Sequence, residues 1–369
     1  MMVNVVTAGT MSGNFNLTRT AAITLTSAAT AILIVIGAVV VARRQQRAKK
    51  QRKPSKWRPV GEITKIFIYP LKSGQVVELV KADCTDLGLK TTDDHPLKIR
   101  DRFFIVFSEE SGNMKTARQH PQMVLIKVSY ADGNQVTFEA PNMPVFKLKL
   151  PDKQAGDSKK KICKLWFEET VEAIDCGDEA AEWMSTFLLQ KKSGARLGYH
   201  ALDSVARRDF SKQPISSLKT YYANIEAHDS GAYADLASYM LMTEESVQEL
   251  KDRVGSKVPA LSPLWFRPNF VMRGSEPFAE DNWDWIRIGD DVILRNIKPC
   301  TRCILTTIDP ETGIKNKSME PLRTLKSYRQ LLDAYSKKTG ADAPALGINL
   351  GLRSHSGIVR VGDPVFVSS

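Results

Sequence analysis

The segment Cys300-Thr301-Arg302-Cys303 holds the residue types of this chain that are best suited to bind a soft metal. A thiolate is a soft ligand, and a neighbouring arginine raises the thiolate fraction and can also hold an anion. Structural zinc needs about four ligands, usually from two such pairs, and the sequence has no second Cys-x-x-Cys. The segment therefore favours a soft metal carried by an anionic cofactor, although two buried cysteines without a function would give the same pattern.

Two further segments offer groups that bind anions. Arg267-Pro268-Asn269 supplies a forked cation and an amide, with a proline that fixes the backbone between them. Lys72 and Ser73 follow an expected strand, and a lysine, a hydroxyl and free backbone N–H groups at such a turn would form a phosphate site. Taken alone, a surface turn explains the first segment, and a strand-end turn explains the second equally well.

Composition argues against nucleic acid as the partner. The chain of 369 residues carries a net charge of +11, but seven of its basic residues lie between Arg43 and Lys53 and leave about +4 for the rest. The sequence shows no internal repeat, nucleotide-binding glycine loop or basic patch interleaved with aromatic residues. The five histidines are scattered and form no His-x-x-x-His pair, so we assign them no ligand role.

The local charge follows an apolar segment. Residues 21–42 carry no charge over 22 positions, which is long enough to span a bilayer as a helix. The basic residues of 43–56 come next, and the positive-inside rule places them and the globular part in the cytosol. A cleaved secretory signal is the competing interpretation, but the apolar stretch is too long and the charge is on the wrong flank. We expect residues 1–20 to be disordered.

The remainder predicts an α+β protein with two β-rich domains, at 57–190 and 205–368. Helices are expected at Glu179–Leu189, after a capping Thr243, and over Leu322–Lys337. A turn is expected at 132–134 and a lysine-rich loop at 152–161. Strands are expected at residues 62–69, 101–106, 124–129, 135–139, 145–150, 269–273, 292–297, 303–308 and 357–361. The strand at 303–308 would hold the Cys303 thiolate rigidly, which makes Cys303 the first choice for a metal ligand.

Several motifs together resemble those of the mitochondrial amidoxime-reducing components, which are molybdenum enzymes built on the MOSC domain. The resemblance covers about residues 57–369, and its motifs come in the family's order. They are Tyr69-Pro70-Leu71-Lys72-Ser73, Arg100-Asp101-Arg102-Phe103, Arg267-Pro268-Asn269, Cys300-Thr301-Arg302-Cys303 and Val361-Gly362-Asp363-Pro364-Val365. The resemblance implies an N-terminal β-barrel domain followed by a MOSC β-barrel domain with flanking helices.

The resemblance also implies roles for individual residues. Cys303 would ligate molybdenum, and Asp235 would lie next to the metal as a proton donor or a substrate-orienting acid. The residues that would contact the molybdenum cofactor (Mo-molybdopterin) are Lys72, Ser73, Arg102, Leu236, Ala237, Arg267, Asn269, Thr301 and Arg302. The family has Thr-Ser after the aspartate, whereas this chain has Leu236-Ala237, which would remove two hydroxyl contacts.

The implied activity is the reduction of amidoximes, hydroxylamines and N-hydroxylated base analogues. Electrons would come from cytochrome b5 and its NADH-dependent reductase, and the anchor would lie in the mitochondrial outer membrane. Two other locations, the endoplasmic reticulum and the peroxisomal membrane, are open alternatives. A persulfide carrier that uses Cys303, or a non-enzymatic scaffold on the outer membrane, are alternative functions.

Overall fold

The computed structural model describes residues 52–131, 135–150, 160–202, 205–208 and 215–368. The part from Pro54 onward forms one compact unit. The expected disordered terminus, transmembrane segment and most of the basic linker lie outside the described residues. So do the expected turn at 132–134 and most of the lysine-rich loop. Within the described ranges, no helix is long and apolar enough to cross a membrane.

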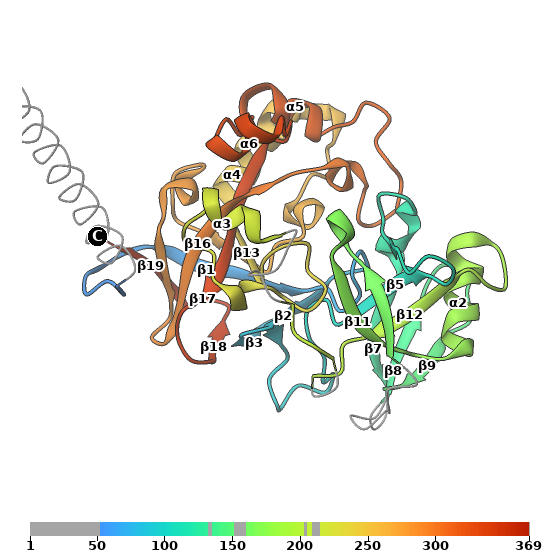
Figure 1. The fold of residues 1–369 in the computed structure, drawn as a ribbon. Helices are drawn as coiled ribbons and strands as arrows, with labels where there is room; N and C mark the ends of the chain where they lie inside the picture. Colours follow the sequence, from blue (N-terminus) through green and yellow to red (C-terminus); the bar gives the residue numbers. More distant parts are fainter. Residues whose placement is uncertain (1–51, 132–134, 151–159, 203–204, 209–214, 369) are drawn as a thin grey trace, which may run out of the picture. The chain divides into compact units, whose positions relative to one another are not determined.

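A closed ring of strands forms one half of this unit (Figure 1). Its order is β14-β13-β17-β16-β15-β19-β1, and β1 pairs again with β14, which closes the barrel; β2 extends from β1. The strands are β1 (Trp57–Ile68), β2 (Val77–Leu79), β13 (Tyr239–Thr243), β14 (Phe270–Arg273), β15 (Trp285–Ile288), β16 (Val292–Thr301), β17 (Ala345–Leu352) and β19 (Pro364–Ser368). The first strand of the predicted N-terminal domain thus lies among strands of the C-terminal part.

The other half contains smaller antiparallel sheets. A five-stranded sheet has the order β10-β11-β12-β5-β6, and β7, β8 and β9 form a meander. A third sheet has the order β18-β3-β4. The strands are β3 (Lys81–Thr85), β4 (Gly88–Lys90), β5 (Phe104–Ser108), β6 (Met114–Lys115), β7 (Lys127–Ala131), β8 (Gln135–Glu139), β9 (Phe146–Lys149), β10 (Lys160–Lys164), β11 (Thr170–Asp175), β12 (Ala195–Tyr199) and β18 (Gly357–Arg360).

Helices cover the sheets at two places. α2 (Asp178–Leu189) packs its Trp183 against Phe138 and Phe146 of the meander, at ring distances of 6.3 and 6.4 Å. α4 (Glu244–Val254) begins at Thr243, whose side chain accepts the Ser246 N–H at 3.1 Å, as the sequence predicts. The structure is therefore α+β, with α3 (Leu218–Tyr221), α5 (Leu322–Tyr328) and α6 (Ala334–Thr339) as short helices.

Two predictions of secondary structure are wrong. The helix expected over 322–337 is broken into α5 and α6, because Asp333 accepts the Ser336 N–H at 2.8 Å and caps a new helix. The strand expected at 303–308 is a single turn of 3-10 helix, Ile304–Thr307. The strands expected at 101–106 and 124–129 begin later, at β5 and β7.

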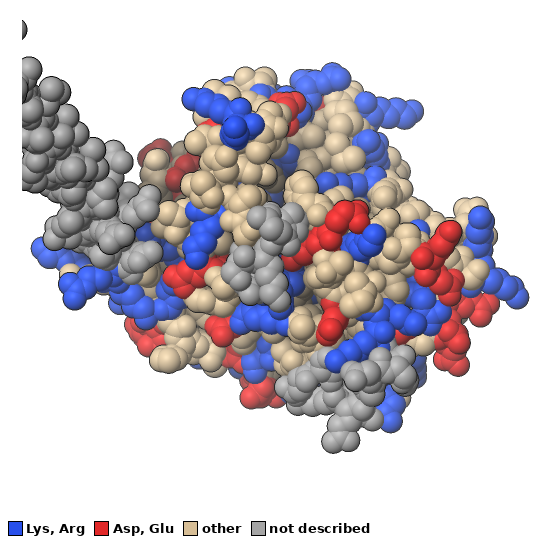
Figure 2. All heavy atoms as spheres, viewed as in Figure 1, with Lys and Arg blue, Asp and Glu red and all other residues tan. Residues whose placement is uncertain are grey.

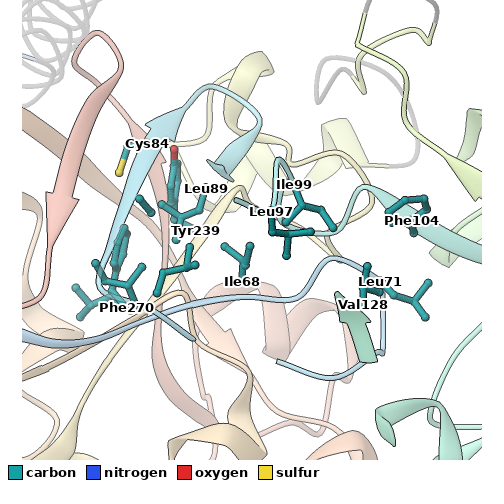
Figure 3. Packing of buried hydrophobic residues seen from close by; sticks show 14 of the residues in the cluster. Ile68, Leu71, Cys84, Leu89, Leu97, Ile99, Phe104, Val128, Tyr239 and Phe270 are labelled. Carbon is teal, nitrogen blue, oxygen red and sulfur yellow. The ribbon is translucent and has the colours of Figure 1, made fainter. Parts of the chain in front are cut away.

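One apolar core joins the barrel to the smaller sheets (Figure 3). At its barrel end, Tyr239 stacks on Phe270 with ring centroids 5.9 Å apart. At its other end, Leu71 pairs with Phe104 of β5, and both side chains are fully buried. Ile68, at the end of β1, is also fully buried. The turn that follows β1, between Ile68 and Leu71, is therefore held in place by closely packed side chains at both of its ends.

Candidate cofactor and metal site

The turn after β1 carries Lys72 into the interior. Its backbone N–H donates to the Phe104 carbonyl at 2.8 Å, and its ammonium donates to the Tyr233 carbonyl at 2.9 Å. Only 5% of Lys72 is exposed, and burial lowers the pKa of its ammonium. Ser73 follows with a left-handed φ of 68° and is also buried. A non-glycine residue keeps this conformation only where its surroundings hold it, which is common at ligand sites.

Asp235 lies beside Lys72, although 163 positions separate them. Its Oδ1 atom accepts hydrogen bonds from the Lys72 ammonium and, at 2.8 Å, from the indole N–H of Trp166. Burial alone would raise the pKa of Asp235, but the Lys72 and Trp166 donors hold it well below its ordinary value. Half of the side chain is exposed, at 52%. The carboxylate is therefore ionised at neutral pH, which favours the substrate-orienting role over that of proton donor.

Two predicted cofactor-binding arginines flank the buried ring of Tyr69. The guanidinium carbon of Arg267 lies 4.1 Å from the ring centroid and that of Arg102 lies 4.9 Å from it. Arg102 donates from Nη2 to the Arg267 carbonyl at 3.2 Å, and Arg267 donates from Nη1 to the Gly74 carbonyl at 2.8 Å. Arg102 also pairs with Asp101, which accepts from the Tyr69 N–H at 2.7 Å. The two arginines are thus fixed to the turn that carries Lys72.

The Arg267 guanidinium has an unsatisfied donor. Its Nη2 atom and the Tyr69 hydroxyl are buried and have no hydrogen-bond partner among the described residues. Burial lowers the pKa of Arg267 to about 10, and the nearby Arg102 charge adds to the effect. An unpaired buried donor on a cation is costly unless an anion satisfies it. This orphaned group is the clearest sign in the structure that an anionic molecule belongs here.

Arg302 is as buried as Lys72 but has a different environment. Its guanidinium donates to the carbonyls of Leu346 at 2.9 Å and Phe266 at 2.8 Å, and contacts the Met240 sulfur at 3.7 Å. These contacts join β17 to the segment that precedes Arg267. Arg302 is a predicted cofactor ligand, but in the structure its guanidinium binds backbone carbonyls.

Cys303 is placed at the start of the 3-10 turn by its neighbours. The Thr306 hydroxyl donates to the Cys303 carbonyl at 2.9 Å, and the Thr307 hydroxyl donates to the Ile304 carbonyl at 2.7 Å. These local bonds compete with a strand ladder and explain why the run is helical. The thiol is partly exposed, and burial raises its pKa, against the opposing charges of Arg118 and Arg302.

The other predicted ligands differ in what they contact. Asn269 is 1% exposed, and its amide bridges β1 and β13 by donating to the Phe67 carbonyl at 3.2 Å and accepting the Met240 N–H at 3.1 Å. Leu236 and Ala237 pack with an apolar cluster around Ile225 and Ile297. Thr301 is exposed at the end of β16.

Sequence reasoning missed three contributors. Trp166 bonds to Asp235, and the guanidinium carbon of Arg118 lies 4.1 Å from the centre of the Trp166 ring. Arg208 donates to the Ala234 carbonyl at 2.5 Å. None of these residues lies in a quoted motif. They come from separate segments of the chain, which only the fold brings together. Tyr69 lies in a quoted motif, but nothing in its sequence context indicates a ring between two guanidinium groups.

Protein ligands alone do not build a metal centre here. Among the described residues, no group of three or more His, Cys, Asp or Glu side chains could hold a metal ion. The Cys303 thiol is close enough to Asp235, Arg118 and Arg302 for their charges to affect its pKa. A single cysteine suits a soft metal that brings further ligands of its own, and nearby cations suit a metal carried by an anionic organic ligand.

Comparisons with known proteins identify the family of this chain. The MOSC N-terminal beta barrel domain matches residues 60–191, and the MOSC domain matches residues 229–366. Mitochondrial amidoxime reducing component 2 of Rattus norvegicus is 37% identical over 318 residues, which cover 86% of either chain. Mitochondrial amidoxime-reducing component 1 of Homo sapiens is 37% identical over 308 residues, or 84% of this chain and 83% of the human one. The chain therefore belongs to the family of mitochondrial amidoxime-reducing components.

Proposed function

We propose that this protein is a molybdenum-cofactor-dependent reductase of N-hydroxylated compounds. The observation that carries the proposal is the buried Nη2 of Arg267, which finds no partner in the ranges that the structure describes and lies in a cationic group with Arg102 and Lys72. The names of the relatives support reduction of amidoximes, and hydroxylamines and N-hydroxylated base analogues share the N–OH group.

The described side chains fit an anionic cofactor in part. Arg267, with Lys72 and the strained Ser73, would hold its phosphate, and Arg102 would add a further positive charge. Cys303 would hold the metal. Because burial raises the pKa of this thiol, it is protonated until a metal displaces the proton, so metal uptake would release a proton. Arg302 and Asn269 would support the site through the backbone.

The chemistry divides between the cofactor and the chain. When bound, the cofactor supplies the redox-active metal at which the N–O bond is cleaved. The substrate gains two electrons and two protons, and its oxygen leaves as water. The ionised Asp235 would orient the substrate by accepting its N–H or O–H group through Oδ2, which has no partner among the described residues. Because the Lys72 ammonium binds Oδ1, the substrate would bind the other carboxylate oxygen.

The sulfur-carrier alternative is less well supported. A persulfide carrier needs a reactive thiolate, which usually has a lowered pKa. Burial raises the pKa of Cys303 instead. The non-enzymatic scaffold gives no reason for a buried, unpaired arginine donor, which would be a cost without a ligand.

Electrons would come from a separate protein, and we propose cytochrome b5 with its NADH-dependent reductase as the source. In the view of Figure 2, Lys and Arg are interspersed with Asp and Glu, so this face presents no unbroken basic surface. Local groups of lysines would then steer an acidic donor.

We also propose that the protein is anchored in the mitochondrial outer membrane by residues 21–42, with its catalytic part in the cytosol. The relatives are named mitochondrial components, which supports the organelle. Fractionation of cells that express the full chain, followed by protease treatment of intact organelles, tests this location. Recovery in the endoplasmic reticulum or in peroxisomes, or protection from the protease, would overturn it.

The activity is tested on the full chain, produced in cells that make molybdenum cofactor. Benzamidoxime is supplied with NADH, cytochrome b5 and its reductase, and benzamidine is measured. We expect turnover that requires all three electron-transfer components. If dithionite supports turnover and the cytochrome does not, the reductase assignment holds and the electron donor is wrong. If neither supports turnover by the molybdenum-loaded protein, the reductase assignment fails.

A further inference from the structure

The turn between β10 and β11 has an unusual composition for a surface turn. It contains Trp166, Phe167 and Glu168, and the Phe167 side chain is 78% exposed. Trp166 is partly exposed, with its indole N–H on Asp235 and the Arg118 guanidinium over its ring. The turn therefore carries two large aromatic residues side by side in the chain, and the first of them, Trp166, contacts Asp235 of the candidate site.

The backbone of this turn is held in a costly conformation. Phe167 has φ 60° and Glu168 has φ 61°, in the left-handed region that favours glycine or asparagine. A bulky aromatic residue gains nothing for folding there, because most of its ring faces solvent. Strain of this kind at a ligand site points to a function for the side chain.

The turn is closed by a hydrogen bond of its own and is linked to the site through Glu169. Leu165 donates its N–H to the Glu169 carbonyl at 2.7 Å. The Glu169 carboxylate receives two hydrogen bonds of 2.8 Å from Arg208, and Arg208 donates to the Ala234 carbonyl. Because Ala234 precedes Asp235, the turn and the Asp235 carboxylate form one connected structure.

We propose that this turn is part of the substrate site: Trp166 positions the Asp235 carboxylate, and Phe167 supplies apolar surface that favours aromatic over small N-hydroxylated substrates. The inference rests on the proposed function and deepens it. The Trp166 N–H and the Lys72 ammonium both bind Oδ1, so they fix the rotation of the carboxylate and leave Oδ2 for the substrate. A ring attached to the N–OH group would lie against the exposed aromatic side chain next to Trp166.

Two amidoximes separate these roles, because benzamidoxime and acetamidoxime share the reacting group and differ in the ring. Their dissociation constants are measured by ligand-observed NMR on the cofactor-loaded, full-length protein without an electron donor, so that no turnover occurs. Turnover is then measured with dithionite as reductant.

Phe167→Asn removes the ring and places a residue that tolerates φ 60°. We expect about tenfold weaker binding of benzamidoxime, equivalent to one lost aromatic contact, and less than about twofold change for acetamidoxime. The melting temperature should stay the same or rise, because the strain is relieved. Ile162→Asn is the matched control, since Ile162 lies on β10 of the same hairpin and is 57% exposed.

Trp166→Phe keeps an aromatic ring and removes the N–H. Turnover of both amidoximes should fall about tenfold, as expected for a lost hydrogen bond to a charged group, while benzamidoxime binding changes less than about twofold. Equal binding ratios for the two amidoximes in Phe167→Asn and wild type would overturn the role of Phe167. Unchanged turnover in Trp166→Phe would overturn the role of Trp166.

The proposed function can fail separately from this inference. Wild-type protein that reduces both amidoximes with an unchanged binding ratio in Phe167→Asn would keep the reductase and discard the aromatic surface. Wild-type protein that binds both amidoximes and reduces neither would discard the reductase, and the binding ratio would still decide the role of Phe167. Wild-type protein that neither binds nor reduces them would overturn both.

Discussion

Arg267, which is partly buried, and Arg302, which is buried, both come from motifs predicted to bind the cofactor, and their guanidinium groups have opposite environments. Arg302 satisfies its guanidinium with the carbonyls of Leu346 and Phe266. Arg267 donates one hydrogen bond to the Gly74 carbonyl and lies over the Tyr69 ring, and its buried Nη2 has no partner in the described part of the chain. The Arg302 guanidinium is therefore satisfied by the protein itself, whereas the Arg267 guanidinium would be satisfied only by an added anion. A cationic sequence motif therefore shows where an anion could bind, and an unpaired donor such as Arg267 Nη2 shows which residue would bind it.

The largest effect should come from removing each arginine in cofactor-free protein. Arg302→Met leaves two buried carbonyls unpaired, so we expect the free energy of unfolding to fall by about 3 kcal/mol. Arg267→Met loses one hydrogen bond but also removes a desolvated charge, so its change should stay below about 1 kcal/mol. Urea unfolding measures both. An equal fall in the free energy of unfolding in the two variants would show that the two guanidinium groups are satisfied to the same extent.

Arg267, whose removal should cost little stability, should matter for retention of the cofactor. Arg267→Met should lower the pterin content of purified protein at least about tenfold, because a charge-assisted bond to phosphate is lost. Arg273→Met is a suitable control, since Arg273 is exposed and pairs only with Glu62 among the described residues. Full pterin content in Arg267→Met would show that Nη2 does not face the cofactor.

The pH dependence of retention should depend on Lys72. Burial lowers the pKa of its ammonium below the ordinary 10.5, so the charge that holds an anion is lost at a lower pH than for a free lysine. Cofactor release should therefore begin as pH rises toward 10.5. In cofactor-free protein, the unfolded chain holds more protons in that range, so Lys72 should make unfolding less favourable as pH rises. Pterin release and urea unfolding across pH 7 to 10.5 check both, and Lys72→Met should abolish both trends.

The smallest effect should come from the two residues that depart from the family pattern. Leu236 and Ala237 pack in an apolar cluster with Ile225 and Ile297. We expect Leu236→Thr with Ala237→Ser to change pterin content less than about twofold, because the surrounding cationic groups stay in place. A large rise would show that the hydroxyl contacts matter and that this chain has a weakened cofactor site.

The sequence predicted those parts of the fold that depend on local signals. The capping Thr243, the apolar face of α2 and the strands around Phe270 are such cases. The prediction of one helix over 322–337 is wrong because Asp333 caps a new helix. The prediction of a strand after Cys303 is wrong because two threonine hydroxyls donate to the carbonyls three residues earlier. The resemblance to the family predicted that Lys72, Arg102 and Arg267 belong to one site. The free donor on Arg267 and the place of Trp166 depend on tertiary packing and have no sequence signal.

Cys303 would hold a metal whose cofactor is bound by the cations around Arg267. Molybdenum and pterin are therefore measured together in the full-length wild type, in Cys303→Ser and in Cys300→Ser. Cys300 is the matched control because it lies three residues earlier, in β16, and packs against an apolar cluster that includes Phe266. We predict about one molybdenum per chain in the wild type and in Cys300→Ser, and its loss in Cys303→Ser. Well-folded wild-type protein without molybdenum, or full retention in Cys303→Ser, would contradict the account.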